Sequence, residues 1–366
     1  MKYSAIILKA DRQNFVVHME SLSFYVEAAA AKAGILPYEL SNNTEYLAVL
    51  RDDTPLIKPS SLRKIIKAHA ELCEKSSCSV YCGLNDVFFI VSAKVYENVL
   101  KTAGGITDFY TFAGAVKEIM KHDKNCEICG VKFSKKEYLV VGDAEKLSFA
   151  AKILRKRINK KHMKTGVFLD DPNFTYIGPR VKIGKGSVIK PGSFVMGETA
   201  IGENCVIGPN TSLFGMTVGS SVNIVNSTAQ NSKIADETQV GPYAYIRPGC
   251  DIGSHVKIGD FVEVKNSVIG DGSKASHLTY IGDAELGQNI NMGCGTITAN
   301  YDGKNKSKTI IEDGAFIGSN SNLIAPVTIK KGAFVAAGST ITDTVPENTL
   351  AIARSRQVIK TEWQRK

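Results

Sequence analysis

An aliphatic residue recurs at every sixth position through three long stretches of the chain after residue 176. The three runs are Ile177, Ile183, Ile189, Val195, Ile201, Ile207 and Leu213, then Val240, Ile246, Ile252, Ile258 and Val264, and finally Ile317, Leu323, Ile329, Val335 and Ile341. An amphipathic α-helix repeats about every 3.6 residues and a half-buried strand every second residue, so neither accounts for this spacing. The period predicts a parallel β-helix, in which each hexapeptide forms one flat side of a triangular coil. The aliphatic side chain points inward, and glycine or small polar residues turn the corners.

The residues before 166 show a different pattern, in which short apolar runs alternate with helical periodicity. The expected strands are 5–10 and 45–53, the expected helices are 23–34, 60–75 and 144–164, and the segment 87–101 is expected to form a strand followed by a helix. Gly34 suits the end of the first helix because glycine adopts the left-handed C-cap conformation without strain. Alternating strands and helices predict an α/β domain.

These patterns divide the chain into three segments. Residues 1–165 are expected to form the α/β domain, with the helix 144–164 as its linker, and residues 166–345 the β-helix. Residues 346–366 leave the six-residue register and form a basic tail that carries the only tryptophan, Trp363. We expect this tail to pack on the coil or on a neighbouring subunit.

The formal net charge of +9 favours anionic partners. The basic residues are dispersed, and the densest run, 153–164, is typical of a solvated helix face. We therefore expect no nucleic-acid partner, and a phosphorylated small molecule or a phosphate-bearing cofactor suits the charge. No window approaches the roughly 18 consecutive apolar residues of a membrane span, and the N-terminus lacks the pattern of a secretory signal. A cytoplasmic protein without a membrane partner is expected.

The eight cysteines are scattered along the chain and do not form a disulfide framework. Cys126 and Cys129 form a lone CxxC motif without a second pair. They are expected to be ordinary strand residues and not a zinc site.

The regular repeat is interrupted between residues 247 and 306 by side chains that a β-helix does not need. These are Arg247, Glu263, Lys265, His277, Tyr280, Asn291, Asn300, Tyr301 and Lys306, the last three within 296–310, which is expected to project as a loop. One coil takes about three hexapeptides, so Arg247, Lys265 and the segment 277–280 are spaced by about one coil. That spacing predicts that they line one edge.

Each of these residues alone has an ordinary structural role. His277 suits a corner hydrogen-bonded to the backbone, and Tyr280 suits packing. Arg247 and Lys265 suit solvated positions. Together, two cations suit a phosphate monoester, and a neutral imidazole suits the removal of a proton from an ammonium group. Glu263 is expected to hold that imidazole in the useful tautomer.

The stretch from "YIRPGC" to "AAGSTIT" (245–342) resembles one bacterial enzyme family. Its members join glucosamine-1-phosphate N-acetyltransferase to N-acetylglucosamine-1-phosphate uridyltransferase, in the synthesis of UDP-N-acetylglucosamine. The match covers essentially all of 165–366 and keeps the motifs "FVEVK", "SHLTY", "ANYDG", "GSNSN" and "AIARSR" in register. The resemblance implies a left-handed β-helix whose coils pack as a homotrimer, with active sites between subunits and a C-terminal tail that reaches a neighbour.

The resemblance also implies a role for each motif residue. His277 would be the general base, oriented by Glu263. The residues implied for glucosamine 1-phosphate are Arg247, Lys265, Tyr280, Asn291 and Lys306, and those implied for the co-substrate acetyl-CoA are Cys294, Asn300, Tyr301, Ser319, Ala337 and Arg354. Cys294 stands where the family more often has alanine, and it is small enough to keep a backbone contact. No metal is expected for acetyl transfer, because the leaving group is a thiol.

The resemblance continues more weakly into the N-terminal domain, which would be a shortened nucleotidyltransferase-like, Rossmann-like domain. The family's phosphate-binding loop, L-x-x-G-x-G-T, aligns with a segment in which Asp11 and Gln13 replace the glycines. Side chains there block the approach of an anion to the backbone. Asp53 aligns with one magnesium ligand, but Gly142 stands where a second ligand, an asparagine, is expected. A lone carboxylate is a poor magnesium site.

These observations predict a glucosamine-1-phosphate N-acetyltransferase that has lost uridyltransferase activity. The N-terminal domain would then serve stability, assembly or regulation. Three alternatives stay open: a retained uridyltransferase, a non-catalytic trimeric scaffold or sugar-nucleotide sensor, and acyl transfer to a different amino sugar.

Overall fold

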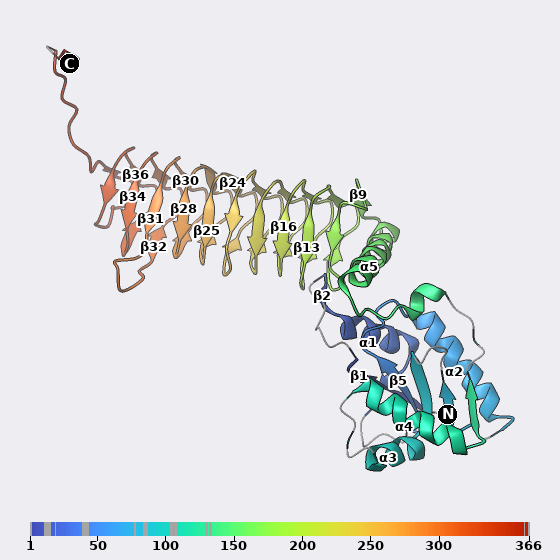
Figure 1. Cartoon of the computed structure of the whole chain (residues 1–366). Coiled ribbons are helices and arrows are strands. Elements are labelled where there is room, and N and C mark those ends of the chain that lie inside the picture. The colour runs from blue at the N-terminus through green and yellow to red at the C-terminus, as the bar shows by residue number, and fades with distance from the viewer. Residues whose placement is uncertain are drawn as a thin grey trace. The chain divides into compact units, whose positions relative to one another are not determined.

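The repeat region folds as a coil of short parallel strands, as the six-residue period predicts (Figure 1). The computed structural model describes residues 2–10, 16–18, 20–38, 44–76, 78–82, 87–102, 105, 108–128, 131, 134–361 and 363–364. The chain divides into two units, Met1–Leu154 and Arg155–Lys366. This boundary lies inside helix α5 (Ala144–Lys164), which has the predicted bounds, whereas the expected domain boundary lay at the end of that helix. None of the helices among the described residues has the length and apolarity needed to cross a bilayer.

The coil has three flat faces, and each face is a parallel sheet whose successive strands belong to successive turns. The first sheet comprises β10 (Tyr176–Ile177), β13 (Phe194–Met196), β16 (Ser212–Phe214), β19 (Thr228–Gln230), β22 (Tyr245–Ile246), β25 (Glu263–Lys265), β28 (Tyr280–Gly282), β31 (Ile297–Ala299), β34 (Asn322–Ile324) and β37 (Thr340–Ile341). The second comprises β11 (Lys182–Ile183), β14 (Ala200–Ile201), β17 (Thr217–Val218), β20 (Lys233–Ile234), β23 (Asp251–Ile252), β26 (Val268–Ile269), β29 (Ala284–Leu286), β32 (Thr309–Ile311) and β35 (Val327–Ile329). The third comprises β9 (Phe168–Leu169), β12 (Val188–Ile189), β15 (Val206–Ile207), β18 (Asn223–Ile224), β21 (Gln239–Val240), β24 (Lys257–Asp260), β27 (Lys274–His277), β30 (Asn291–Met292), β33 (Phe316–Ile317), β36 (Phe334–Val335) and β38 (Leu350–Ala351).

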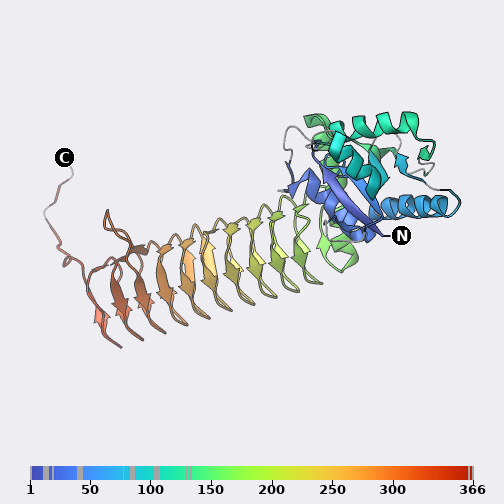
Figure 2. The ribbon, with the colours of Figure 1, turned by 90° about the horizontal axis from the view of Figure 1, so that it is seen from below.

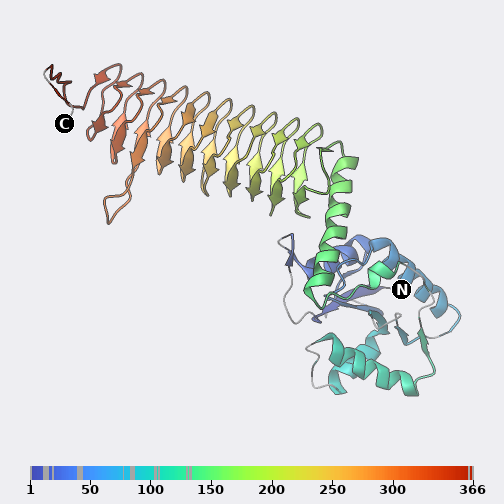
Figure 3. The ribbon, with the colours of Figure 1, turned by 45° about the horizontal axis from the view of Figure 1, so that its top comes forward.

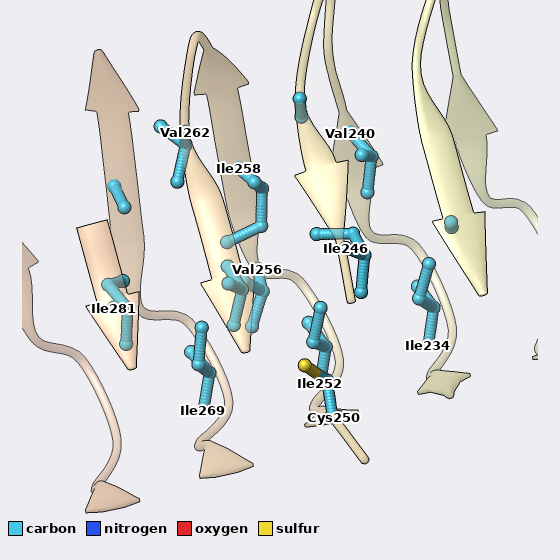
Figure 4. Packing of buried hydrophobic residues seen from close by; sticks show 14 of the residues in the cluster. Ile234, Val240, Ile246, Cys250, Ile252, Val256, Ile258, Val262, Ile269 and Ile281 are labelled. Carbon is cyan, nitrogen blue, oxygen red and sulfur yellow. The ribbon is translucent and has the colours of Figure 1, made fainter. Parts of the chain in front are cut away.

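The inward side chains of each turn stack on those of the next (Figure 4). Ile246 is fully buried opposite Val264, and Ile252 is fully buried opposite Ile269. Burial of one such side chain contributes about 1.5–3 kcal/mol. Because the same contact repeats along the axis, each turn is stabilised chiefly by its two neighbours.

The inward spacing contracts to five residues in parts of the coil. The inward residues between Leu213 and Val240 are Val218, Ile224, Ala229 and Ile234, and all of them are buried. The strands nevertheless stay paired, with Ser212 opposite Thr228. A corner has therefore lost one residue while the inward position is kept. For this reason the six-residue spacing of aliphatic residues is interrupted between Leu213 and Val240.

Residues with left-handed φ turn many of the corners. Asparagine is frequent at these positions, for example Asn204 at 56° and Asn231 at 43°. Three corners on successive turns instead carry the bulky residues Tyr243, Phe261 and Leu278, at φ values of 58°, 56° and 39°. A bulky side chain in this region of φ is strained. Folding of the coil alone would favour asparagine or glycine at these three corners instead of the bulky side chains that are present.

One loop and the C-terminal tail depart from the coil. The predicted loop joins β31 to β32 and leaves the body of the coil (Figure 3). Strand β38 pairs with β36, so the coil continues beyond the expected end at residue 345. The chain then leaves the coil (Figure 2), with Val358, Ile359 and Trp363 exposed. Of the two positions expected for the tail, packing on its own coil is not observed for these three side chains.

The N-terminal unit is an α/β domain built on a mixed sheet. The sheet contains β1 (Tyr3–Leu8), β4 (Leu36–Pro37), β5 (Tyr46–Arg51), β6 (Val80–Cys82), β7 (Phe88–Ser92) and β8 (Cys126–Ile128) in the order β4-β1-β5-β7-β6-β8, and β2 (Val16–Val17) pairs with β3 (Glu20–Ser21) outside it. Strand β7 runs antiparallel to β5 and β6. The described helices of the N-terminal unit are α1 (Leu22–Ala33), α2 (Pro59–Cys73), α3 (Ala93–Thr102), α4 (Phe109–His122) and a 3₁₀ helix (Lys135–Tyr138), in addition to the first half of α5. Gly34 ends α1 at a left-handed φ of 85°, as predicted.

Two hydrophobic cores lie on opposite faces of this sheet. Leu47 and Val49 of β5 pack with residues of α3 and α4, whereas Ala48 and Leu50 pack with residues of α1 and α2. This alternation follows from the period of two along a strand. The central strands are therefore buried on both faces, as in other three-layer α/β domains.

Candidate functional site

Three of the expected cations gather on one region of the coil. Arg247 follows β22, Lys265 ends the neighbouring strand β25, and Lys306 belongs to the loop that leaves the coil. The side-chain nitrogens of Lys265 and Lys306 lie close to each other. This contact and the positive charges of Lys265 and Arg247 lower the pKa of Lys306, while the contact with Lys306 and a hydrogen bond to Asp283 raise the pKa of Lys265. Mutual repulsion of this kind would be relieved by a bound anion.

Two carboxylates bind two of these cations, Arg247 and Lys265. Glu263 Oε1 accepts a hydrogen bond from Arg247 Nη1 at 2.9 Å. Asp283 Oδ2 accepts one from Lys265 Nζ at 3.3 Å and another from Asn300 Nδ2. Partial burial opposes ionisation of Asp283, but the hydrogen bonds from its neighbours lower its pKa. The carboxylates therefore fix the positions of these two cations and leave the three cations in excess over the two anions.

Tyr280 also reaches this group. It lies opposite Glu263 in register, and its phenol covers Gly282, which is the strand partner of Lys265. A Cβ on Gly282 would lie 2.3 Å from the Tyr280 Oη, so glycine is needed there for the ring to occupy this place. The side chain of Tyr280 therefore belongs to the same region as Arg247 and Lys265.

His277 lies at the end of β27 and its side chain is 61% exposed. Its Nδ1 lies 2.6 Å from Oδ1 of Asp260, the last residue of the neighbouring strand β24. The expected partner, Glu263, is instead bound to Arg247. The reason is the register: Asp260 is the Cα partner of His277, whereas Glu263 is the partner of Tyr280. The expectation that Glu263 orients His277 is thus wrong for the contacts within this chain.

Small exposed residues follow His277 along the same corner of the coil. The Gly295 N–H donates to Leu278 O, the Asn320 N–H to Cys294 O, and the Gly338 N–H to Ser319 O. Cys294, Ser319 and Ala337 are therefore on successive turns, and all three are exposed. A Cβ on Gly338 would lie 3.9 Å from Cδ of Arg354, which places that arginine at the far end of the row.

The remaining candidates lie at three different places. Asn291 starts β30 on the third sheet, opposite Lys274, and is half-buried. Asn300 is 9% exposed and is engaged by Asp283, so it adjoins the cations. Tyr301 is exposed in the loop, where its hydroxyl donates to Gly303 O at 2.7 Å. Among the described residues, no hydrogen bond or ion pair joins His277 to Arg247, Lys265 or Lys306.

An exposed apolar ridge lies beside His277. It consists of the three strained corner residues Tyr243, Phe261 and Leu278, which are 58%, 59% and 59% exposed. The rings of Tyr243 and Phe261 stack with centroids 5.5 Å apart. Leu278 directly follows His277, and Phe261 directly follows Asp260. Contiguous exposed apolar side chains of this kind mark an interaction surface more often than isolated ones do.

Asp53, which aligns with a magnesium ligand of the family, is already paired in the N-terminal unit. Both carboxylate oxygens of Asp53 accept hydrogen bonds from Arg51, at 2.9 Å from Nε and 2.8 Å from Nη2. Asp53 is 2% exposed and Arg51 is 7% exposed. The guanidinium also contacts the Tyr110 hydroxyl at 2.9 Å and lies over the ring of Phe109. With both oxygens engaged by a buried cation, this carboxylate does not fit a magnesium ion. The altered loop at Asp11 and Gln13 lies outside the described residues.

Comparison with known proteins identifies the repeats and a set of relatives. A model of the family described as bacterial transferase hexapeptide (six repeats) matches residues 180–215, 231–266 and 308–343. The protein named bifunctional protein GlmU from Geobacillus sp. (strain WCH70) is 45% identical over 345 residues, which are 94% of this chain and 74% of the relative. The bifunctional protein GlmU of Clostridioides difficile (strain 630) is 44% identical over 91% of this chain and 71% of its own length.

Two solved structures are similar to about half of this chain. A UDP-N-acetylglucosamine acyltransferase of Francisella novicida is similar over 51% of this chain and 67% of that chain, with 20% identity and a TM-score of 0.28. The corresponding enzyme of Arabidopsis is similar over 51% and 70%, with 18% identity and a TM-score of 0.32.

Proposed function

This chain belongs to the family of the bifunctional protein GlmU and is a hexapeptide-repeat acyltransferase of UDP-N-acetylglucosamine biosynthesis. From this premise we propose that it transfers acetyl from acetyl-CoA to glucosamine 1-phosphate. The observation that carries the proposal is the grouping of Arg247, Lys265 and Lys306 on the face of the coil that adjoins the corner of His277. Three neighbouring cations suit a dianionic phosphate monoester. An exposed imidazole with one nitrogen held by a carboxylate suits a general base.

The sugar phosphate is proposed to bind at the cation group. Its phosphate relieves the repulsion between Lys265 and Lys306, and Arg247 adds a planar donor pair that matches two phosphate oxygens. Tyr280 lies against the same group and offers a hydroxyl to the sugar. Asn291 completes the proposed acceptor set.

The donor is proposed to lie along the row of small residues. Strands in a sheet are about 4.8 Å apart, so the four steps from His277 to the turn of Arg354 span about 19 Å. Small side chains at Cys294, Ser319 and Ala337 leave this corner open to an extended chain. Arg354 at the far end suits a phosphate of the donor, and Asn300 and Tyr301 complete the proposed donor set.

The proposed chemistry is a direct acyl transfer. The amine of the sugar phosphate attacks the thioester carbonyl, and Nε2 of His277 takes the proton that the amine releases. The C–N bond forms as the C–S bond breaks, and the thiolate that leaves receives the proton from the imidazolium. Positioning both substrates on adjoining turns supplies the proximity contribution to the rate.

We expect the purified protein to release thiol from acetyl-CoA only with an acceptor that has both a free amine and a phosphate. Glucosamine 1-phosphate provides both, glucosamine lacks the phosphate, and N-acetylglucosamine 1-phosphate lacks the amine. The initial rate of thiol release with each acceptor is the measurement. Equal rates with glucosamine and its phosphate would favour a different amino-sugar acceptor.

We further propose that uridyltransferase activity is lost, because Arg51 occupies the carboxylate that a magnesium ion would need. The same preparation is incubated with UTP, magnesium and N-acetylglucosamine 1-phosphate, and pyrophosphate is measured. Pyrophosphate formation would contradict this part of the proposal and leave the acyl transfer untouched.

A homotrimer is proposed, with the apolar ridge at the contact between subunits. Burial of Tyr243, Phe261 and Leu278 against a second copy removes a strained and exposed apolar surface from water. Because Phe261 and Leu278 adjoin Asp260 and His277, such a contact places a neighbouring subunit beside the base. The exposed C-terminal tail has the apolar residues needed to contact that neighbour.

The double variant Tyr243→Asn and Phe261→Asn is expected to lower the molar mass in solution from trimer to monomer and to reduce thiol release. Asparagine tolerates left-handed φ, so the corners themselves keep their conformation. Light scattering coupled to size exclusion measures the mass. Val268→Asn removes a similarly exposed side chain, 48% exposed, from the second sheet and serves as the control. A trimer that persists in the double variant would place the interface elsewhere.

A further inference from the structure

We infer that Asp260 is the positioning residue of His277, and that Glu263 positions Arg247. This inference rests on the proposed function, since it gives His277 the role of base. The motif "FVEVK" (261–265) suggested Glu263 as the partner of the base, and Asp260 is the residue directly before this motif. The structure separates them on two strands, β24 and β25.

The geometry of the pair is set by rigid elements. Asp260 and His277 are Cα partners at the ends of two paired strands, so the coil itself fixes their spacing. The Nδ1–Oδ1 distance of 2.6 Å is short for an N–H···O hydrogen bond, and a carboxylate acceptor shortens such bonds. A loop could not hold the imidazole as firmly, because its backbone is not paired on both sides.

The hydrogen bond defines the tautomer of His277. When Nδ1–H donates to Asp260, the lone pair of the neutral imidazole is on Nε2, which is the nitrogen free to accept a proton from substrate. The carboxylate then stabilises the imidazolium that forms during the reaction. The hydrogen bond from His277 lowers the pKa of Asp260, so the carboxylate is ionised throughout the working range.

The surroundings add few other charges. Lys257, on the same strand as Asp260, is the other residue that lowers the pKa of Asp260, and its effect is smaller than that of His277. Cys294 occupies the next turn beyond His277, and Glu263 is engaged with Arg247. A change at Asp260 is therefore expected to act on His277 first.

Replacing Asp260 by asparagine is expected to lower kcat about 100-fold with nearly unchanged KM for both substrates. The amide keeps the shape but can donate to Nδ1, which stabilises the wrong tautomer. Removing the negative charge also takes away the stabilisation of the imidazolium that forms during the reaction, so the acidic limb of the kcat/KM profile is expected to move to lower pH. Asp260→Glu should recover part of the loss, and in the His277→Ala background the asparagine variant should cause no further loss.

Two matched variants separate this role from a general effect of charge. Glu263→Gln is expected to raise KM for the sugar phosphate, through Arg247, without moving the pH limb. Glu237→Gln removes the carboxylate that lies 3.4 Å from Nδ1 of His255, an exposed histidine elsewhere on the coil, and is expected to leave all kinetic constants unchanged.

The outcomes distinguish this inference from the proposed function. If the Asp260→Asn variant forms a folded trimer with the wild-type kcat and an unchanged acidic limb of the kcat/KM profile, the role of Asp260 is overturned. The same follows if that acidic limb moves in Glu263→Gln but not in Asp260→Asn. If His277→Ala retained full activity, the base itself would be misassigned and the proposed function would fail first.

Discussion

The His277→Ala variant is expected to release thiol from acetyl-CoA about a thousandfold more slowly than the wild type. Removal of a general base lowers the rate about 10²–10⁴-fold. In the proposed chemistry, no other residue at this corner takes the proton from the amine. The side chain is 61% exposed, so its loss leaves no cavity in the coil. Thiol release at saturating glucosamine 1-phosphate is the measurement, and KM for both substrates should change little.

His255→Ala is the matched control for this experiment. His255 is also an exposed histidine of the coil, 63% exposed and close to a carboxylate, but it lies outside the candidate site. Its variant should keep the wild-type rate. If the wild type itself shows no turnover although its trimer is folded, and neither variant differs from it, the non-catalytic scaffold or sensor becomes the better hypothesis.

The Arg51→Ala variant is expected to lose about 3–5 kcal/mol of stability in the N-terminal unit, because it leaves the buried carboxylate of Asp53 without a partner. Arg51 also stacks on Phe109 and bonds Tyr110, which adds to the loss. Urea unfolding followed by the helical circular-dichroism signal measures it. The signal is specific for this unit and its linker, since the helices of the described residues all end by residue 164.

A double substitution tests the cause of that loss. Arg51→Met with Asp53→Leu removes both charges and should recover most of the stability, because a well-packed apolar pair replaces a buried ion pair at little cost. Lys121→Ala breaks an exposed pair with Glu118 and should have little effect. A wild-type unfolding midpoint in Arg51→Ala would show that the ion pair does not stabilise the domain.

The β-helix could be predicted from the sequence because its core position repeats in one dimension. Ile246 and Ile252 follow the period and are buried as expected. Positions such as Thr298 could not be found in this way. Thr298 points inward, fully buried, and its hydroxyl accepts from Gly282 N at 2.8 Å and donates to Gly282 O at 3.1 Å. A search for aliphatic residues misses a polar side chain that satisfies its own hydrogen bonds.

The candidate site was predicted as a set of residues, but its pairings were not. Asp260 was missed because it lies next to a bulky corner residue, where the apolar pattern gives no information about side chains. The signal that could have found it is the turn length. Asp260 lies 17 residues before His277, and one turn in this part of the coil takes 17 residues, as Lys257 and Lys274 show. The same count places Asp283 on the turn next to Asn266, and Asp283 accepts hydrogen bonds from both Asn266 and its chain neighbour Lys265.

In the N-terminal unit, the sequence predicts β1, β5, β7, α1, α2 and α3, but helix α4 and strand β6 were not predicted. Helix α4 begins with two aromatic residues and contains Gly114, a combination that lowers local helix propensity. Its helical state is supported by the Asp108 cap and by burial of Phe109 and Phe112 in the core. Tertiary packing overrides local preference there, and a single sequence does not reveal such packing.

The row of exposed small residues, Cys294, Ser319 and Ala337, limits the length of the acyl donor that the proposed site would accept. The distance from His277 to Arg354 is a whole number of turns, so it changes only in increments of about 4.8 Å. Because each turn contacts only its neighbours, one turn inserted between Cys294 and Ser319 would lengthen that distance without disturbing either end. With the acyl donor bound along this row as proposed, the number of turns between His277 and Arg354 would set the distance that a donor needs between its thioester and its phosphates.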